Sequence, residues 1–168
     1  MPEFFPSLPE VYVQPGESRL VTAPSLMKTL LGSCVGITFW APHLGIAGLC
    51  HPMLPHCPDH RLGRTSVVAG RRYVDFAIRD LAQQLDAHGA RRGYVHVKLF
   101  GGCDVLPVSN QSGRPTVGRL NYEAALRILE SEGFRVSASC LGGSRGITIF
   151  FNTESGEVFL RRLSEPCA

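Results

Sequence analysis

The sequence has no long apolar run and no marked excess of either charge. No segment approaches the roughly 20 consecutive apolar residues that a membrane-spanning helix needs. Lysine and arginine (17) nearly balance aspartate and glutamate (14), so the net charge is only +3 with neutral histidines. The basic residues form pairs and no patch, which argues against nucleic acid as a partner. The first residues lack the basic and apolar regions of a secretory signal. We therefore expect a cytoplasmic protein without membrane insertion.

The usual signatures of nucleotide and metal binding are also missing. Gly101-Gly102 and the glycines at 142–146 do not have the form of a phosphate-binding loop, and we expect them to permit turns with positive φ. Cysteine and histidine do gather between residues 50 and 60, at Cys50, His51, His56, Cys57 and His60. Their spacing fits no standard zinc knuckle. We therefore predict no metal site, with zinc in this segment as the open alternative.

Because we expect a cytoplasmic protein, we interpret the six cysteines as free thiols and not as a disulfide framework. At 168 residues, 44% hydrophobic and 18% charged, the chain is long enough for one domain with a sizeable core. We predict a flexible arm over residues 1–10, the domain over 11–164 and a tail over 165–168.

The order of predicted elements indicates an α+β fold. Alternation of apolar residues predicts strands, and helical spacing predicts helices, with Asn121 as the N-cap of the second helix. The strands are expected in a hairpin over 11–21 and at 35–40, 46–51, 94–100, 134–141, 147–152 and 158–163, and the helices at 72–88 and 122–132. This order favours mixed or antiparallel sheets over a doubly wound parallel sheet.

The segment from residue 30 to residue 55 combines a cysteine with a histidine. We predict a hairpin of residues 35–40 and 46–51 with a four-residue turn at 41–44, in which Trp40 pairs with Gly45. In that register Cys34 lies directly opposite His51, with Cβ atoms about 4.5–5.5 Å apart. Cys50, the neighbour of His51, should point to the opposite face and into the core.

Two interpretations of this pair stay open on spacing alone. In the first, His51 takes the proton of the Cys34 thiol and stabilises the thiolate as an ion pair. The bend at Gly32-Ser33 would then aim backbone N–H groups at a developing oxyanion. In the second, Cys34 is a small buried hydrophobe and His51 a hydrogen-bonded strand residue without a chemical role.

Several motifs, in order along the chain, resemble those of the CheD family of chemoreceptor glutamine deamidases. The resemblance covers approximately residues 12–163 and lies in the segments 31–35, 51–55, 72–78, 98–102, 117–121, 141–146 and 153–158. It implies a single-domain β-sandwich with two main helices packed outside, with which the predicted order of elements is compatible.

The resemblance also implies an activity and its residues. The activity is hydrolysis of glutamine side-chain amides on methyl-accepting chemotaxis receptors, with Cys34 as nucleophile, His51 as the proton carrier and backbone amides near Ser33 and Cys34 as oxyanion donors. A family threonine that orients the histidine corresponds best to Thr29, with Lys28 as the alternative position. No metal or organic cofactor is implied.

Family members also bind a CheC-type phosphatase. Two other functions therefore stay open: a chemotaxis regulatory protein that acts mainly through such a phosphatase, and a cysteine hydrolase with another protein target.

Overall fold

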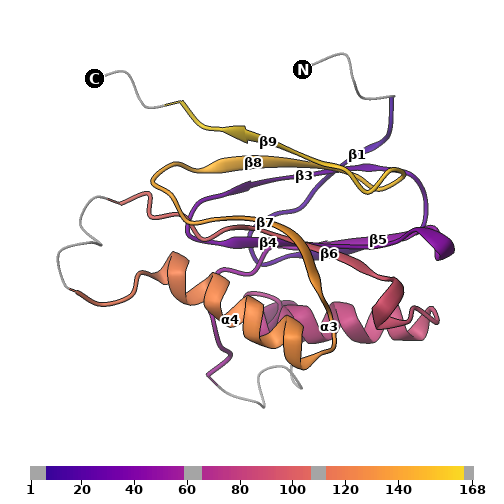
Figure 1. The fold of residues 1–168 in the computed structure, drawn as a ribbon, viewed down its shortest axis with the longest axis horizontal. Coiled ribbons are helices and arrows are strands. Elements are labelled where there is room, and N and C mark those ends of the chain that lie inside the picture. Colours follow the sequence, from indigo (N-terminus) through magenta and orange to yellow (C-terminus); the bar gives the residue numbers. More distant parts are fainter. Residues whose placement is uncertain (1–6, 59–65, 107–112, 165–168) are drawn as a thin grey trace.

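Two β-sheets and a layer of helices make up the computed structural model, which describes residues 7–58, 66–106 and 113–164 (Figure 1). The first sheet has the strand order β1-β3-β8-β9 and the second β2-β5-β4-β6-β7. The strands are β1 (Glu10–Tyr12), β2 (Ser18–Val21), β3 (Leu26–Leu31), β4 (Val35–Ala41), β5 (Ile46–Cys50), β6 (His96–Gly101), β7 (Val136–Leu141), β8 (Ile147–Asn152) and β9 (Val158–Arg162). The α-helices are α2 (Val67–Gly70), α3 (Val74–Ala87) and α4 (Val117–Ser131).

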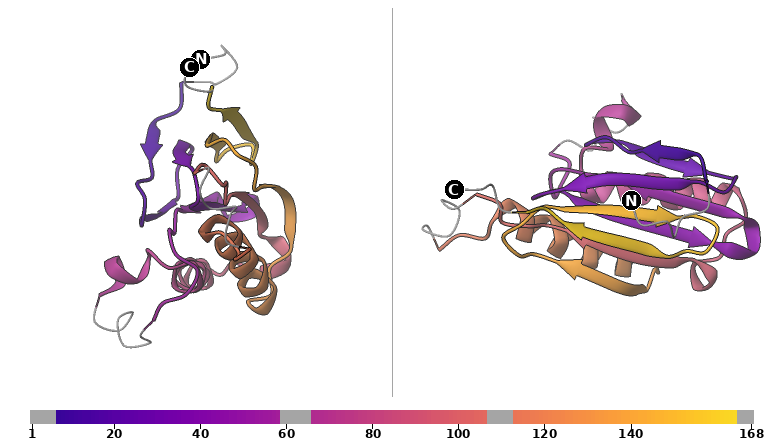
Figure 2. Two further views of the ribbon diagram at one scale, coloured as in Figure 1. Left: turned by 90° about the vertical axis from the view of Figure 1, so that its left-hand side faces the viewer. Right: turned by 90° about the horizontal axis from the view of Figure 1, so that it is seen from above.

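The five-stranded sheet is the middle layer of the molecule. The four-stranded sheet covers one of its faces, and α3 and α4 cover the other (Figures 1 and 2). Antiparallel pairs dominate, but β1–β3 and β6–β7 are parallel. The predicted α+β sandwich with two main helices outside is therefore confirmed.

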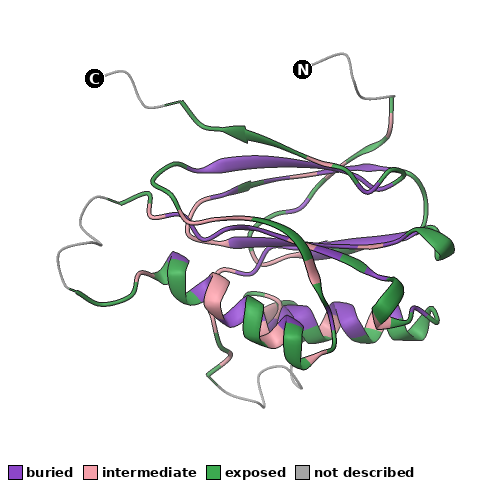
Figure 3. Cartoon of the chain, in the orientation of Figure 1, coloured by how far each residue is buried: buried purple, intermediate pink, exposed green. Residues whose placement is uncertain are grey.

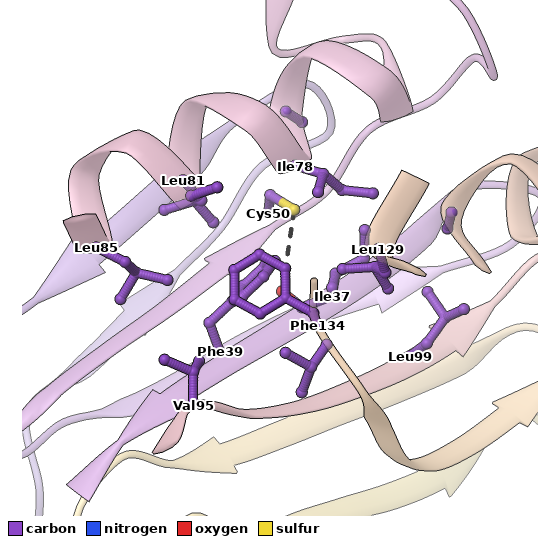
Figure 4. Close-up of a cluster of buried hydrophobic side chains, with 14 of the residues drawn as sticks. Ile37, Phe39, Cys50, Ile78, Leu81, Leu85, Val95, Leu99, Leu129 and Phe134 are labelled. Atoms are coloured by element: carbon purple, nitrogen blue, oxygen red, sulfur yellow. Dashed lines mark hydrogen bonds between the residues drawn. The ribbon is translucent and has the colours of Figure 1, made fainter. Parts of the chain in front are cut away.

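Each face of the middle sheet has its own hydrophobic core, because neighbouring side chains on a strand point to opposite faces. Toward the helices, Ile37 and Phe39 of β4 pack against Ile78 and Leu81 of α3 (Figure 4). Between the sheets, Leu49 of β5 belongs to a second cluster with buried residues of β3 and β8. Burial is accordingly concentrated in the inner strands and the inner sides of the helices (Figure 3). Each fully buried side chain contributes about 1.5–3 kcal/mol.

The structure differs from the predicted elements in three respects. β1 and β2 do not form a hairpin, because β1 pairs with β3 in one sheet and β2 with β5 in the other. Strand β3, which carries Thr29, was not predicted. Helix α4 begins at Val117, and its N-cap is Thr116, whose side chain accepts a hydrogen bond from the Arg119 amide. Asn121 therefore lies inside the helix and is not its cap.

The predicted hairpin register is also wrong. The four-residue connection runs from Pro42 to Gly45, one residue later than predicted, and Ala41 pairs with Ile46. Gly45 adopts a left-handed φ of 63°, which belongs in a turn and not in a strand. A turn moved by one residue shifts every pair by two positions, so the side chains keep their faces but change their partners.

The arm and the tail stay predictions, because residues 1–6 and 165–168 lie outside the described part of the chain. Pro9, within the predicted arm, accepts a hydrogen bond from the Leu26 amide, and Glu10 starts β1. Among the helices of residues 7–58, 66–106 and 113–164, none combines the length and apolar character needed to cross a membrane.

Candidate active site

The turn that joins β3 to β4 carries Cys34, and donors from other elements hold all of its carbonyl groups. The Gly32 carbonyl accepts from the Cys103 amide at 2.8 Å, and the Cys34 carbonyl from the Gly102 amide at 2.8 Å. The Ser33 carbonyl accepts from the side chain of Asn121 at 2.9 Å. Three short hydrogen bonds therefore fix three consecutive peptide planes.

This arrangement leaves the Ser33 and Cys34 amides without a backbone acceptor among the described residues. In a trans peptide the N–H points away from the C=O, and the described chain has no cis peptide. The Ser33 and Cys34 amides therefore face away from the donors that hold the preceding carbonyls. Neither donates to a backbone carbonyl of the described residues. Two free N–H groups beside a sulfur are what an oxyanion-binding site requires.

The Cys34 turn lies unusually close to the end of β6. Gly101 and Gly102 have φ values of 98° and 65°, which L-residues rarely adopt. A Cβ atom at Gly101 would overlap the Cys34 carbonyl oxygen. Glycine is required here both for the backbone conformation and for the close approach. The positive φ was predicted from the sequence, and the close approach was not.

His51 follows β5 and meets Thr29 of β3, so this contact joins the two sheets. The Thr29 hydroxyl oxygen lies 2.7 Å from His51 Nδ1 and 2.7 Å from the Val13 carbonyl oxygen. A hydroxyl has one proton, and the carbonyl can only accept it. The Nδ1–H of His51 must therefore donate to Thr29, which leaves Nε2 without a proton in the neutral ring. Thr29 is placed as predicted.

The basic nitrogen of His51 is buried and available. The residue is 1% exposed, and Nε2 has no hydrogen-bond partner in the described structure. An unpartnered buried polar atom is unusual and calls for an explanation. A lone pair kept for proton transfer provides one.

Cys34 and His51 are not directly opposite each other, so that prediction was wrong. The Val35 amide donates a hydrogen bond to the Pro52 carbonyl at 3.3 Å. The antiparallel β4–β5 pairing therefore continues beyond Cys50 in the same register. In this register Cys34 is opposite Met53, and His51 is its diagonal neighbour on the same face. Diagonal neighbours are about 7–8 Å apart at Cα and closer at Cβ, within reach of long side chains.

Burial favours the neutral form of both groups. It lowers the pKa of His51 from 6.5 to about 4, although the hydrogen-bonded Val13 carbonyl acts in the opposite direction. Burial also raises the pKa of the Cys34 thiol above its ordinary value of 9.0, against a smaller opposing effect of the Cys34 amide. Burial therefore disfavours the thiolate–imidazolium ion pair that the sequence analysis expects.

The alternative position, Lys28, faces away from this site. It precedes Thr29 on β3 and so points to the other face of the sheet. Its ammonium lies 5.4 Å from the centre of the Phe150 ring. Thr29, not Lys28, is therefore the residue that contacts His51.

Sequence reasoning missed the role of Asn121 at this site. This residue of α4 is fully buried, and its Nδ2 donates to the carbonyl oxygens of Ser33 and Met53, both at 2.9 Å. One available signal was its position on the buried face of the helix, four residues before Ala125 and eight before Leu129. A polar residue in such an apolar stripe needs partners.

Over its described residues, 50–58, the Cys/His segment does not converge on one point. Cys50 lies in the core between the middle sheet and α3, as predicted (Figure 4). The Cys57 amide donates to Asp75, and His56 lies beside the same carboxylate. His60 lies outside the described residues. Within residues 7–58, 66–106 and 113–164, no group of three or more His, Cys, Asp or Glu side chains is placed to hold a metal ion.

A small apolar cleft of about 180 Å³ opens against the Cys34 turn. Its lining includes Ser33, Val105 and the first turn of α4, at Val117 and Gly118. Val105 and Val117 are both more than 40% exposed. Apolar side chains therefore lie at the surface beside the Cys34 turn.

Comparison with known proteins agrees with the motifs of the sequence. Residues 53–162 match a family model described as CheD chemotactic sensory transduction. The chain is 40% identical over 159 residues to the "Probable chemoreceptor glutamine deamidase CheD 2" of Geobacter sulfurreducens, covering 95% of this chain and 93% of that protein.

Other relatives are somewhat more distant. The "Probable chemoreceptor glutamine deamidase CheD" of Pseudomonas syringae pv. tomato is 37% identical over 153 residues, 90% of this chain and 88% of that protein. Among solved structures, YlmD from Geobacillus stearothermophilus is similar at a TM-score of 0.49 and 13% identity, over 75% of this chain and 50% of that one. On the family match and the identity to its relatives, the chain belongs to the CheD family.

Proposed function

We propose that this protein is a cysteine-dependent glutamine deamidase that converts glutamine side chains of methyl-accepting chemotaxis receptors to glutamate and releases ammonia. The names of its relatives support the substrate. The observation that carries the chemistry is the Thr29–His51 hydrogen bond, because it leaves a bare, buried Nε2 near the Cys34 turn. The target helices are cytoplasmic in this proposal, and so is the enzyme.

The first half of the reaction forms a thioester. Nε2 of His51 takes the Cys34 proton as the sulfur attacks the carboxamide carbon, and the carbonyl oxygen becomes an oxyanion. The free amides of Ser33 and Cys34 donate to this oxyanion. When the tetrahedral intermediate collapses, the C–N bond breaks, and the His51 imidazolium gives its proton to the departing nitrogen. Ammonia leaves.

The second half restores the enzyme. Neutral His51 removes a proton from water, and the resulting hydroxide attacks the thioester carbon. The same amides hold the second oxyanion. The C–S bond breaks, Cys34 regains its proton from His51, and the side chain leaves as a carboxylic acid that loses its proton to water and becomes glutamate. All atoms exchanged come from the substrate, water and these side chains, so the steps need no metal or organic cofactor.

The pKa values of Cys34 and His51 determine the role of His51. Burial raises the pKa of the Cys34 thiol and lowers that of His51 to about 4, so transfer of the proton from the thiol to the imidazole is unfavourable before a substrate is attacked. His51 then acts as a general base during attack, and Thr29 stabilises the imidazolium as it forms.

Two other functions are the alternatives to this proposal. A regulatory protein that acts through a CheC-type phosphatase would need a docking surface and no base near a thiol. A cysteine hydrolase with another protein target would use the same site. The available Nε2 favours hydrolysis over binding alone, and the relatives favour receptor glutamines.

The test is to incubate the protein with the cytoplasmic fragment of a chemoreceptor and to measure ammonia and peptide masses. Each converted glutamine gains about 1 Da as NH₂ is replaced by OH in the proposed hydrolysis. We expect this gain with the unaltered protein and with Cys50→Ala, the matched cysteine control, and no gain with Cys34→Ala. Full activity of Cys34→Ala, with a preserved melting temperature, would contradict the proposal.

A further inference from the structure

Asn121 makes two contacts that connect the Cys34 turn with the segment that follows His51. Its Nδ2 donates one hydrogen to the Ser33 carbonyl, in the peptide that precedes Cys34, and the other to the Met53 carbonyl, two residues after His51. Both partners can only accept, so the orientation of the amide is fixed. One side chain of α4 therefore holds the nucleophile turn and the histidine segment at a set separation.

The other polar atom of this side chain, Oδ1, makes no hydrogen bond in the described structure. Asn121 is fully buried, and its Oδ1 has no hydrogen-bond partner in the described structure. Its helical neighbours on the same face, Ala125 and Leu129, are apolar. An unsatisfied buried acceptor destabilises a fold, and buried polar atoms of this kind call for an explanation.

The contact with Ser33 determines where the Cys34 amide points. Because the Ser33–Cys34 peptide is trans and planar, fixing its carbonyl toward Asn121 turns the Cys34 N–H to the opposite side. Without this hydrogen bond, the peptide is free to rotate about the bonds that flank it. The direction of a prospective oxyanion donor thus depends on a residue 87 positions later in the chain.

Two glycines allow α4 to come close enough for this contact. A Cβ atom on Gly118 would overlap the backbone of Gly102, and a Cβ atom on Gly102 would overlap the backbone of Gly118. Gly102 in turn donates to the Cys34 carbonyl. The beginning of α4 is therefore packed directly on the backbone that supports the Cys34 turn, which places Asn121, one turn further along, beside Ser33.

We propose that Asn121 is a positioning residue, which orients the Ser33–Cys34 peptide so that the Cys34 amide faces the oxyanion site and holds this peptide in register with the segment of His51. The inference rests on the proposed thioester mechanism. It assigns to α4 a part in the chemistry, although Asn121 itself need not touch the substrate.

Two reactions of Cys34 separate this role from a structural one. Acylation by p-nitrophenyl acetate passes through an oxyanion, whereas alkylation by iodoacetamide does not. We expect Asn121→Leu, which removes the donors at similar size, to slow Cys34 acylation 10- to 100-fold, in line with the loss of an oriented oxyanion donor. Alkylation should stay within about twofold, because it needs only the sulfur. Rates from Cys34→Ala are subtracted to remove the other thiols.

A second variant and a matched control complete the experiment. Asn121→Asp keeps the size of the side chain but loses the NH₂ group, and should show the same selective loss if Asn121→Leu does not fold. Ala125→Gly weakens the same helix one turn further on without touching the Cys34 turn, and should leave the ratio of acylation to alkylation unchanged. With receptor substrate, both Asn121 variants should lower kcat and leave KM nearly unchanged.

The outcomes are distinct. Equal loss of both reactions, an unchanged ratio, or no Cys34-dependent acylation in the unaltered protein would overturn the role of Asn121. An unaltered protein that acylates at Cys34 but releases no ammonia from receptors would overturn the proposed function and leave the positioning role intact.

Discussion

Varying pH in an alkylation experiment tests whether Cys34 is ionised in the resting protein. Burial raises the pKa of this thiol above 9.0 and lowers that of His51 to about 4, so no charged partner stabilises a thiolate. At pH 7 the thiolate should then make up less than about 1% of the protein. A resting ion pair would instead keep the sulfur almost fully ionised through the neutral range.

The rate of alkylation reports this difference directly. We expect the rate constant for iodoacetamide at Cys34 to rise about tenfold per pH unit from pH 6 to pH 8, because the thiolate is the reacting form. An ion pair would give a flat profile over the same range. The absolute rates differ by less than the thiolate fractions, since a thiolate of low pKa is a weaker nucleophile. The slope is therefore the quantity to compare.

The measurement resolves each cysteine by mass spectrometry after digestion, because Cys57 and Cys140 also have some exposure. His51→Gln is the informative variant. If the pair is neutral at rest, this change should alter the alkylation profile less than about threefold while nearly abolishing deamidation. A plateau between pH 6 and 8 that disappears in His51→Gln would refute the reasoning from burial and restore the ion pair.

Three further predictions follow from single contacts. His51 has a pKa of about 4 in the folded protein and 6.5 when unfolded, so the unfolded chain binds its proton first as the pH falls. The free energy of unfolding should therefore decrease by about 3 kcal/mol between pH 6.5 and pH 4. Urea titrations should show that this decrease is absent in His51→Gln. Thr29→Val leaves His51 Nδ1 and the Val13 carbonyl without hydrogen-bond partners, which should lower the free energy of unfolding by about 1–3 kcal/mol and kcat more than tenfold. An unchanged kcat would contradict the assignment of Thr29 as the residue that orients His51. Gly101→Ala forces an L-residue into a φ of 98° and displaces the Cys34 carbonyl. Calorimetry should therefore show a loss of about 1–3 kcal/mol in stability, and the rate of deamidation should fall. A wild-type melting temperature would contradict this prediction.

The parts of the fold that depend on local pattern could be predicted from the sequence. Helix α3 and strand β8 were correctly placed because their apolar residues follow one period over the full element. Pairing could not be deduced in the same way. β1 and β2 look like a hairpin around Pro15-Gly16, yet they join different sheets, since their partners β3 and β5 lie elsewhere in the chain.

The site shows the same division between local and long-range information. The sequence predicts the turn after β4 one residue too early, because the pattern does not reveal that Gly45 has a positive φ and belongs to the turn. The error kept Cys34 and His51 on one face and changed only their separation. Thr29 was found through the family motif. Asn121 was assigned as a helix cap because its partners, Ser33 and Met53, are more than 60 residues away.

The most direct test of the account is interception of the thioester. The protein is incubated with a receptor fragment in the presence of hydroxylamine, which attacks a thioester in place of water, and the target residues are examined by mass spectrometry. We predict that glutamyl hydroxamate forms at the same glutamines that otherwise become glutamate, and that Cys34→Ala forms neither product. Conversion to glutamate without any hydroxamate, or either product from Cys34→Ala, would contradict the claim that Cys34 is acylated during deamidation.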